Sequence, residues 1–176
     1  VENLREARQN DSIEAVVLDV DSPGGTAAAS EQLYLAVKRT AAEMPVVTSV
    51  TGTAASGSYY AAIPSEQIYV TPASVVGSVG VRATVPASGP VEGEVVTGPD
   101  KNSGSTEAEV YERVETLRRA FVGAVFAERG DRIDLTREEV SHAKVYSGAA
   151  GVENGLADEV GGVDTAVAAA ADEAGL

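Results

Sequence analysis

"IEAVVLDVDSPGGTAAASEQLYLAVKRTAAEMPVVTSV", residues 13–50, contains the alternation that decides the fold. An apolar, β-branched run at 13–20 predicts a strand, and "DSPGG" interrupts it. A helix is expected over 26–43, with Thr26 as a plausible cap, and a second strand over 44–50. Continuous apolar runs of this kind are typical of strands buried on both faces of a parallel sheet. Strand, helix and strand in this order predict a βαβ unit.

The flanking sequence extends this unit in both directions. A short helix is expected at 3–10, another at 56–63, and a third strand at 67–70, which together give βαβαβ. The Pro- and Gly-rich stretch 83–105 favours a hairpin flanked by mobile loop. Apolar residues at helical spacing predict a long amphipathic helix over 106–129. The chain therefore reads as one α/β domain over 1–176, with a mostly parallel sheet and a C-terminal helical region. The remaining expected elements are a helix at 136–143 capped by Thr136, a strand, turn, helix and turn over 145–162, and an Ala-rich helix over 163–176.

Charge and composition exclude several classes of function. The chain has 27 acidic and 13 basic residues and a net charge of −14, which disfavours binding to nucleic acid or anionic lipid. Arginine outnumbers lysine and the acidic residues are spread along the chain, a pattern similar to that of haloarchaeal proteins, with an ordinary acidic protein as the alternative. The absence of cysteine excludes disulfides and thiolate metal sites.

No stretch reaches the ~20 apolar residues of a membrane span, so the chain as given is expected to be soluble. Its start at Val1 suggests a processed or truncated product.

The stretch "DVDSPGG", residues 19–25, is the first candidate for chemistry. Adjacent glycines between a strand and a helix let backbone N–H groups approach a ligand closely. Such groups suit the oxyanion hole of an acyl-transfer enzyme. A plain strand-to-helix turn is the equal alternative.

The second candidate is "TAASGSYYAAI", residues 53–63. Ser56 falls where a strand meets a helix, between Ala55 and Gly57, which suits an exposed nucleophilic hydroxyl with the next backbone N–H directed at an oxyanion. The alternative is that Ser56 is a simple helix N-cap. Tyr59 and Tyr60 are expected to pack the helix rather than bind substrate.

A serine hydroxyl is a weak nucleophile, so a general base is required. A Ser–His–Asp triad would have to use His142, the one histidine. In a Ser–Lys dyad, a partly desolvated lysine accepts the hydroxyl proton. The lysines are Lys38, Lys101 and Lys144, and Lys101 is favoured because the loop around it is long enough to fold back across a pocket.

Five stretches, in order, resemble the signal peptide peptidase A (SppA, protease IV) family of Ser–Lys peptidases, which share the ClpP/crotonase-like fold. The resemblance covers nearly the whole chain, although no stretch is decisive alone. One family feature differs at Ser58, where the usual pattern "AASGGYY" has glycine. The interval from Ser56 to Lys101 is also shorter than is typical, and the family's N-terminal membrane helix and first strand are missing. The five stretches are "VVLDVDSPGG", "PVVTSVTGTAASGSYYAA", "TPASVVGSVGV", "VVTGPDK" and "VYSGAAGVENGLADEVGG".

The resemblance implies a role for each site residue. Ser56 would be the nucleophile, Lys101 the general base, and Ser78 the residue that orients the lysine amine. The backbone N–H groups of Gly24 and Gly57 would form the oxyanion hole. No metal or cofactor is implied.

The implied activity is hydrolysis of apolar peptides such as signal peptide remnants. The implied partners are the peptide substrate and further copies of the chain in a homo-oligomeric ring. In a full-length protein, membrane association would come through a segment absent here, with the peptidase domain outside the cytoplasm. Two alternatives stay open: a catalytically silent assembly subunit of the same fold, and a crotonase-like acyl-CoA enzyme.

Overall fold

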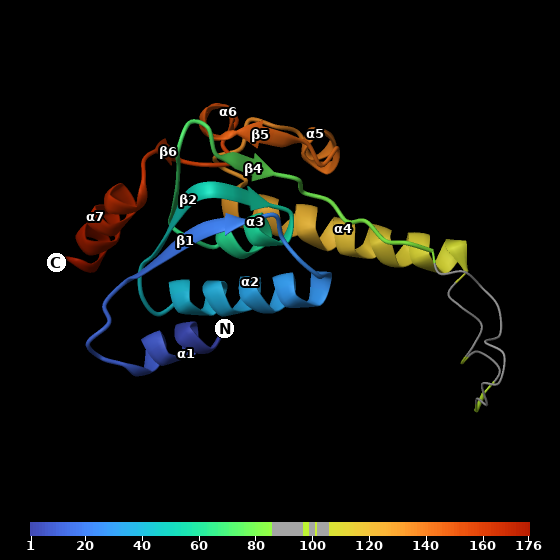
Figure 1. Cartoon of the computed structure of the whole chain (residues 1–176), viewed down its shortest axis with the longest axis horizontal. Coiled ribbons are helices and arrows are strands. Elements are labelled where there is room, and N and C mark those ends of the chain that lie inside the picture. Colours follow the sequence, from blue (N-terminus) through green and yellow to red (C-terminus); the bar gives the residue numbers. More distant parts are fainter. Residues whose placement is uncertain (86–96, 99–100, 102–105) are drawn as a thin grey trace.

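The computed structural model describes residues 1–85, 97–98, 101 and 106–176. Within these ranges a six-stranded sheet lies among helices (Figure 1). Strands and helices alternate through the first 70 residues, as the sequence predicts. The elements are α1 (Glu2–Gln9), β1 (Val16–Ser22), α2 (Ala27–Ala41), β2 (Val46–Ala55), α3 (Gly57–Ala62), β3 (Gln67–Val70), β4 (Val75–Gly77), α4 (Glu107–Arg129), α5 (Arg137–Ser141), β5 (Val145–Ser147), α6 (Gly148–Glu153), β6 (Glu159–Val160) and α7 (Val163–Ala174).

Strand β2 is the centre of the sheet. β1 pairs with it in parallel along one side. On the other side, β3 pairs with residues 47–50 and β4 with residues 53–55, both in parallel. The predicted parallel sheet is therefore confirmed, and the ends of β1, β2 and β4 meet at one edge.

The C-terminal part of the chain adds two outer strands. β5 runs antiparallel to β4, and β6 runs parallel to β3. A strand and a helix occur within 145–162 as expected, but no turn separates them, because α6 begins at Gly148 directly after β5. The segment also contains a strand that was not predicted, β6, beside Tyr69 and Val70. Strand β4 was not predicted either. The hairpin expected over 83–105 lies largely outside the described residues.

The two faces of the sheet are covered by different helices. Val46 of β2 packs with Leu4 of α1 and Val37 of α2. Its neighbour Val47 packs with Ala166 of α7 on the opposite face. Successive strand residues point to opposite faces, which explains why a continuous apolar run is needed here.

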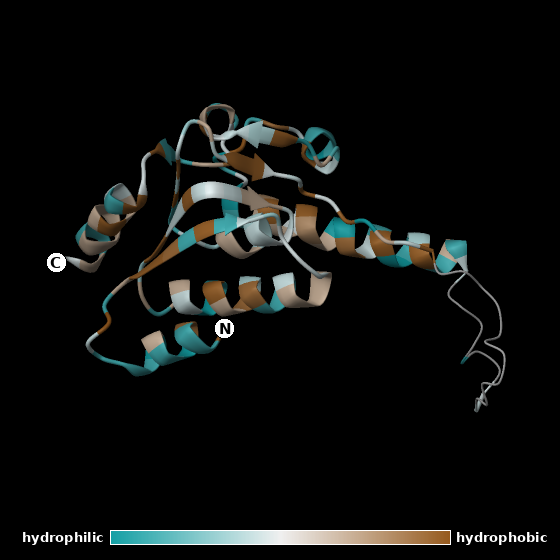
Figure 2. Ribbon diagram, viewed as in Figure 1, coloured by the Kyte–Doolittle hydropathy of each residue, from teal (hydrophilic) through white to brown (hydrophobic). Residues whose placement is uncertain are grey.

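Helix α4 is the longest element, and only part of it is buried in the main core. Its start is fixed by a capping box in which Thr106 and Glu109 exchange hydrogen bonds. Figure 1 shows its N-terminal part extending beyond the end of α2. Phe121, Val122 and Val125 in its C-terminal half are buried in the main core, and Figure 2 shows hydrophilic and hydrophobic residues alternating along the helix. No helix in the described ranges combines the length and apolar character needed to cross a bilayer.

A buried arginine attaches the end of α4 to the segment before β6. Arg129 is 1% exposed. Its guanidinium donates to the carbonyl oxygen of Gly155 and to both carboxylate oxygens of Asp158, the closer at 2.9 Å. Asp158 also accepts from the backbone N–H of Ile68 at 2.7 Å. A buried charge with several hydrogen bonds is tolerated because its donors are satisfied.

Candidate active site

Ser56 occupies the sharp junction between β2 and α3. Its backbone lies at φ 55° and ψ −122°, a conformation that side-chain-bearing residues rarely adopt. The Ser56 N–H donates to the carbonyl of Gly77 at 2.9 Å, which holds the junction against β4. Ser56 stands at the N-cap position of α3, but within the described residues its side chain makes no capping hydrogen bond. The simple N-cap interpretation therefore loses its support, and the half-buried hydroxyl is available for chemistry.

Gly24 brings the end of β1 against the Ser56 junction. A Cβ atom built on Gly24 would lie 2.7 Å from the Gly57 nitrogen and 3.0 Å from the Ser56 Cβ. Gly24 also has φ +100°, so both its backbone angle and its surroundings require glycine. Its own N–H donates to Ser22 Oγ over a long 3.3 Å, a bond that a stronger acceptor can replace.

The backbone amides of Gly57 and Gly25 also lie beside the Ser56 junction. Gly57 is the first residue of α3, so its N–H has no acceptor within the helix. The Gly25 nitrogen is 3.2 Å from the position that a Cβ on Gly57 would occupy. The structure thus brings the "SPGG" amides and the Gly57 amide together beside Ser56, an arrangement suited to stabilising an oxyanion.

Ser78 follows β4 at the same edge of the sheet. The pairing of Ala55 with Gly77 makes Ser56 and Ser78 the next residues on neighbouring strands. Ser78 also has a positive φ, 54°, and its N–H donates to the carbonyl of Lys144 at 2.8 Å. The structure therefore places Ser78 beside Ser56.

The three lysines have different surroundings. Lys38 lies 2.6 Å from a Glu128 carboxylate oxygen, and its pKa is raised chiefly by that hydrogen bond and then by one to Tyr34. A raised pKa keeps the amine protonated, which is the opposite of what a general base needs. Lys101 is exposed, and its backbone N–H donates to Gly98 at 3.3 Å. Lys144 is also exposed, beside Ser78 through its backbone. No contact between a lysine amine and Ser56 is found among the described residues.

His142 lies at the C-terminal end of α5 and is exposed. Its backbone N–H donates to carbonyls of the same helix, at 3.2 Å to Glu138. Within the described part of the chain, its side chain has no carboxylate partner to orient it, as a Ser–His–Asp triad would require.

Tyr59 and Tyr60, which follow Ser56, pack α3 as expected. Tyr59 is 0% exposed, its hydroxyl donates to the Leu156 carbonyl at 2.8 Å, and burial raises its pKa. The Tyr60 ring stacks on Tyr34 with centroids 4.5 Å apart and contacts Phe121 at 4.7 Å. The short helix is therefore held by aromatic contacts to α2 and α4.

The sequence profile of peptidase family S49 matches residues 38–89 and 94–176, more than half of the chain. The chain belongs to peptidase family S49. Protease 4 of Salmonella typhi is 34% identical over 189 residues, in a match that covers 98% of this chain and 30% of that relative. A protein named Putative signal peptide peptidase SppA from Enterococcus faecium is 30% identical, covering 90% of this chain and 50% of that relative. The S49 chain thus spans half or less of the length of these relatives.

Solved structures confirm the predicted ClpP/crotonase-like α/β fold of the S49 chain. The membrane-bound stomatin-specific protease 1510-N, a mutant in complex with a substrate peptide, has a TM-score of 0.63 at 18% identity, covering 97% of this chain and 70% of that one. A ClpP1 mutant from Listeria monocytogenes has a TM-score of 0.62 at 14% identity, covering 94% and 88%. The family name and the protease names of these relatives agree with the predicted enzyme class, a peptidase.

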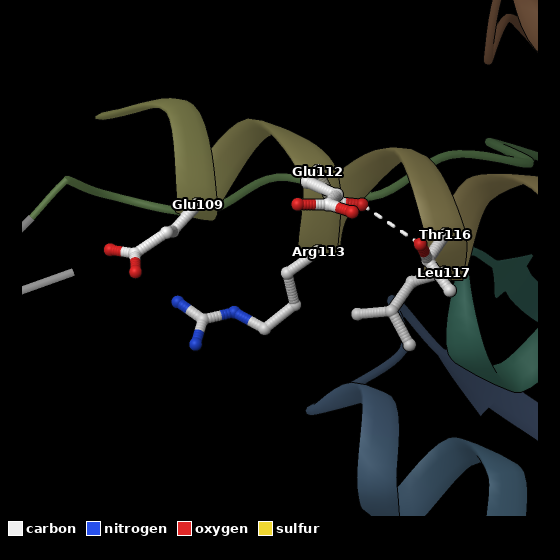
Figure 3. A pocket seen from close by; sticks show the side chains of 5 residues that line it. All are labelled: Glu109, Glu112, Arg113, Thr116 and Leu117. Atoms are coloured by element: carbon white, nitrogen blue, oxygen red, sulfur yellow. Dashed lines mark hydrogen bonds between the residues drawn. The ribbon is translucent and has the colours of Figure 1, made fainter. Parts of the chain in front are cut away.

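An open hollow of about 300 Å³ lies elsewhere, along the first half of α4 (Figure 3). Its described lining residues all come from this one helix, and none of them is predicted for the active site. Within the described part of the chain a single helix face does not form the concave site that a substrate pocket requires. The lining residues are Glu109, Glu112, Arg113, Thr116 and Leu117.

Sequence reasoning missed two contributors to this site in the S49 chain. The Ser58 hydroxyl contacts Ser22 at the end of β1 and Ala55 at the end of β2. The Asp21 carboxylate accepts from the Thr53 N–H at 2.9 Å. The one available signal was the departure of Ser58 from the usual glycine.

Proposed function

We propose that the chain is a serine endopeptidase that uses a Ser–Lys dyad, with Ser56 as nucleophile and Lys101 as general base. The observation that carries the proposal is the convergence at Ser56: a strained junction whose hydroxyl makes no capping bond, beside the amides of Gly24 and Gly57. Residues held in rare backbone conformations cluster at active sites, where the surrounding structure offsets a cost of about 1–3 kcal/mol.

The proposed reaction has two steps. The neutral Lys101 amine takes the proton from the Ser56 hydroxyl as its Oγ attacks the substrate carbonyl carbon, and Ser78 orients the amine. The Gly24 and Gly57 N–H groups donate to the tetrahedral oxyanion. Collapse breaks the peptide C–N bond, and the leaving amine takes a proton from the lysine. The same amine then takes a proton from water as the water oxygen attacks the acyl carbon. The ester C–O bond to Ser56 breaks, and the lysine returns the proton to Ser56 Oγ.

The choice of Lys101 rests on the family resemblance and on the elimination of Lys38, whose amine Glu128 holds. Lys144 is the second candidate for the base, because its carbonyl accepts from the Ser78 N–H and so places its backbone at the same edge of the sheet.

We infer extended apolar peptides as substrates, including signal peptide remnants. The name of the Enterococcus faecium relative supports this class, and the solved 1510-N structure holds a substrate peptide. The likeness to ClpP1 is consistent with a homo-oligomer. Membrane association of a full-length protein, with the peptidase domain outside the cytoplasm, belongs to the same proposal.

Reaction with a fluorophosphonate probe tests the function directly. The wild type should be labelled, and Ser56→Ala and Lys101→Ala should each lower the labelling rate at least ~100-fold. Lys38→Ala is the matched control and should label at the wild-type rate. If Lys144→Ala abolishes labelling while Lys101→Ala does not, Lys144 is the base.

The rival functions predict different outcomes of the same assay. A silent assembly subunit predicts no labelling of the wild type in any assembled form. A crotonase-like acyl-CoA enzyme predicts binding of an acyl-CoA that does not depend on Ser56 or Lys101. Sedimentation of the purified chain at increasing concentration measures the proposed self-association.

A further inference from the structure

The hydroxyl of Ser58 joins two strand ends that are far apart in the sequence. Its Oγ lies 2.6 Å from the carbonyl oxygen of Ser22 and 2.9 Å from both the amide nitrogen and the carbonyl oxygen of Ala55. A serine hydroxyl has one proton to donate. The geometry therefore assigns donation to Ser22, the closer carbonyl, and acceptance from the Ala55 N–H.

This bridge lies where the backbone pairing of β1 with β2 is interrupted. The strands are in regular register up to Val20 and Val50, but the next pair is Ser22 with Ala54. Over that irregularity, side chains take the place of ladder hydrogen bonds: Asp21 accepts from the Thr53 N–H, and Ser58 links Ser22 to Ala55. Without these bonds, polar backbone groups at a part-buried position would lose their partners.

The bridged residues flank the two oxyanion donors. Ser22 is two residues before Gly24, and Ala55 is two residues before Gly57. These two glycines are already in contact, since a Cβ on Gly24 would lie 2.7 Å from the Gly57 nitrogen. A change in how the strand ends are joined would therefore change the separation and direction of the two N–H groups.

We infer that Ser58 is a positioning residue that holds the Gly24 and Gly57 amides in the geometry that stabilises the transition state. The inference rests on the proposed function, in which Ser56 is the nucleophile and these amides are the oxyanion donors. The hydrogen bonds of the Ser58 hydroxyl go to the backbone of Ser22 and Ala55, so its proposed effect acts through these strand ends. Loss of Ser58 should therefore lower kcat rather than raise KM, because the oxyanion forms only after the hydroxyl has attacked the bound peptide.

The test compares hydrolysis of a peptide ester and of the matched thionoester by the whole chain. Oxyanion donors stabilise oxygen better than the larger, weaker acceptor sulfur, so the ratio of the two kcat/KM values reports donor geometry. Ser58→Ala should lower ester kcat about tenfold with little change in KM, less than the ~100-fold loss expected from deleting a donor. It should also reduce the oxygen-to-sulfur ratio severalfold.

Two variants separate this role from a merely structural one. Ser58→Thr keeps the hydroxyl and should keep the wild-type ratio. Ser74→Ala removes a different buried hydroxyl, which donates to Thr71 at 2.8 Å, and should leave the ratio unchanged even if the folded fraction falls. Partial unfolding lowers both rates equally, so it does not alter the ratio.

The outcomes that overturn the inference are distinct from failure of the proposed function. If Ser58→Ala keeps the wild-type ratio of ester to thionoester kcat/KM, and its ester hydrolysis still depends on Ser56, the role of Ser58 is overturned. The peptidase proposal then still stands. Absence of Ser56-dependent hydrolysis in the wild type overturns both.

Discussion

Ser56 and Gly24 show how single residues build the site. The first holds a φ of 55° despite its side chain, and the second has a φ of +100° that glycine accepts readily. The strain at Ser56 is maintained by its hydrogen bond to Gly77 and by the packing of α3. The site therefore depends on close backbone approach rather than on large side chains.

Replacement of Gly24 by alanine should damage both folding and activity. The new Cβ would be forced to within 2.7 Å of the Gly57 nitrogen at an unfavourable φ. We expect destabilisation of about 1–3 kcal/mol in urea unfolding and a loss of fluorophosphonate labelling of at least ~100-fold. Gly25→Ala is the matched control for stability, because a Cβ there meets no atom within 4 Å. Equal unfolding free energies for the two variants would contradict this account.

The sequence predicted part of this site for a clear physical reason. Ser56 and Gly57 could be singled out as candidates because a small-residue stretch between a strand and a helix is a local pattern. The roles of Ser22 and Ser58 depend on β1 and β2 ending side by side, a contact between residues 36 positions apart. Local patterns do not encode such a contact. Lys101 stays a prediction.

Among the elements, the C-terminal end of α4 depends on one buried cation. Arg129→Leu should destabilise the chain by about 3 kcal/mol in urea unfolding, because it removes the guanidinium that donates to the Gly155 carbonyl and to both oxygens of the Asp158 carboxylate. Arg132→Leu removes an exposed donor to the same carboxylate and should cost less than about 1 kcal/mol. If the two variants lower the free energy of unfolding equally, Arg129 has no special role in attaching β6 to α4.

Element lengths explain which parts of the fold could be predicted. β1, β2, α2 and α4 contain enough residues for an apolar run or a helical period to be visible. β4 has three residues and β6 has two. A period cannot be recognised over so few positions, and β4 and β6 lie in the sheet as partners of β2 and β3. β5 is as short as β4 and was predicted as part of a longer pattern of strand and helix over 145–162.

For the whole molecule, the net charge of −14 predicts a stability that rises with salt. Self-repulsion destabilises a compact chain of one dominant sign, and salt screens it. The unfolding temperature should increase by several degrees from low to about 0.5 M sodium chloride. A variant that exchanges several exposed glutamates for glutamines should show a smaller increase. A flat or falling dependence would show that the attractive pairs outweigh the net repulsion.

The attachment of β4 has a consequence for how the proposed active site would be lost. β4 joins β2 through three residue pairs, from Thr53 with Val75 to Ala55 with Gly77. β1, in contrast, pairs along β2 from Val46 to Ala54, and β3 pairs with four residues of its earlier part. Local opening of β4 and β5 would withdraw Ser78 from Ser56 while the rest of the sheet stayed intact. Inactivation in mild denaturant should then precede global unfolding, and the amides of β4 should exchange with deuterium sooner than those of central β2.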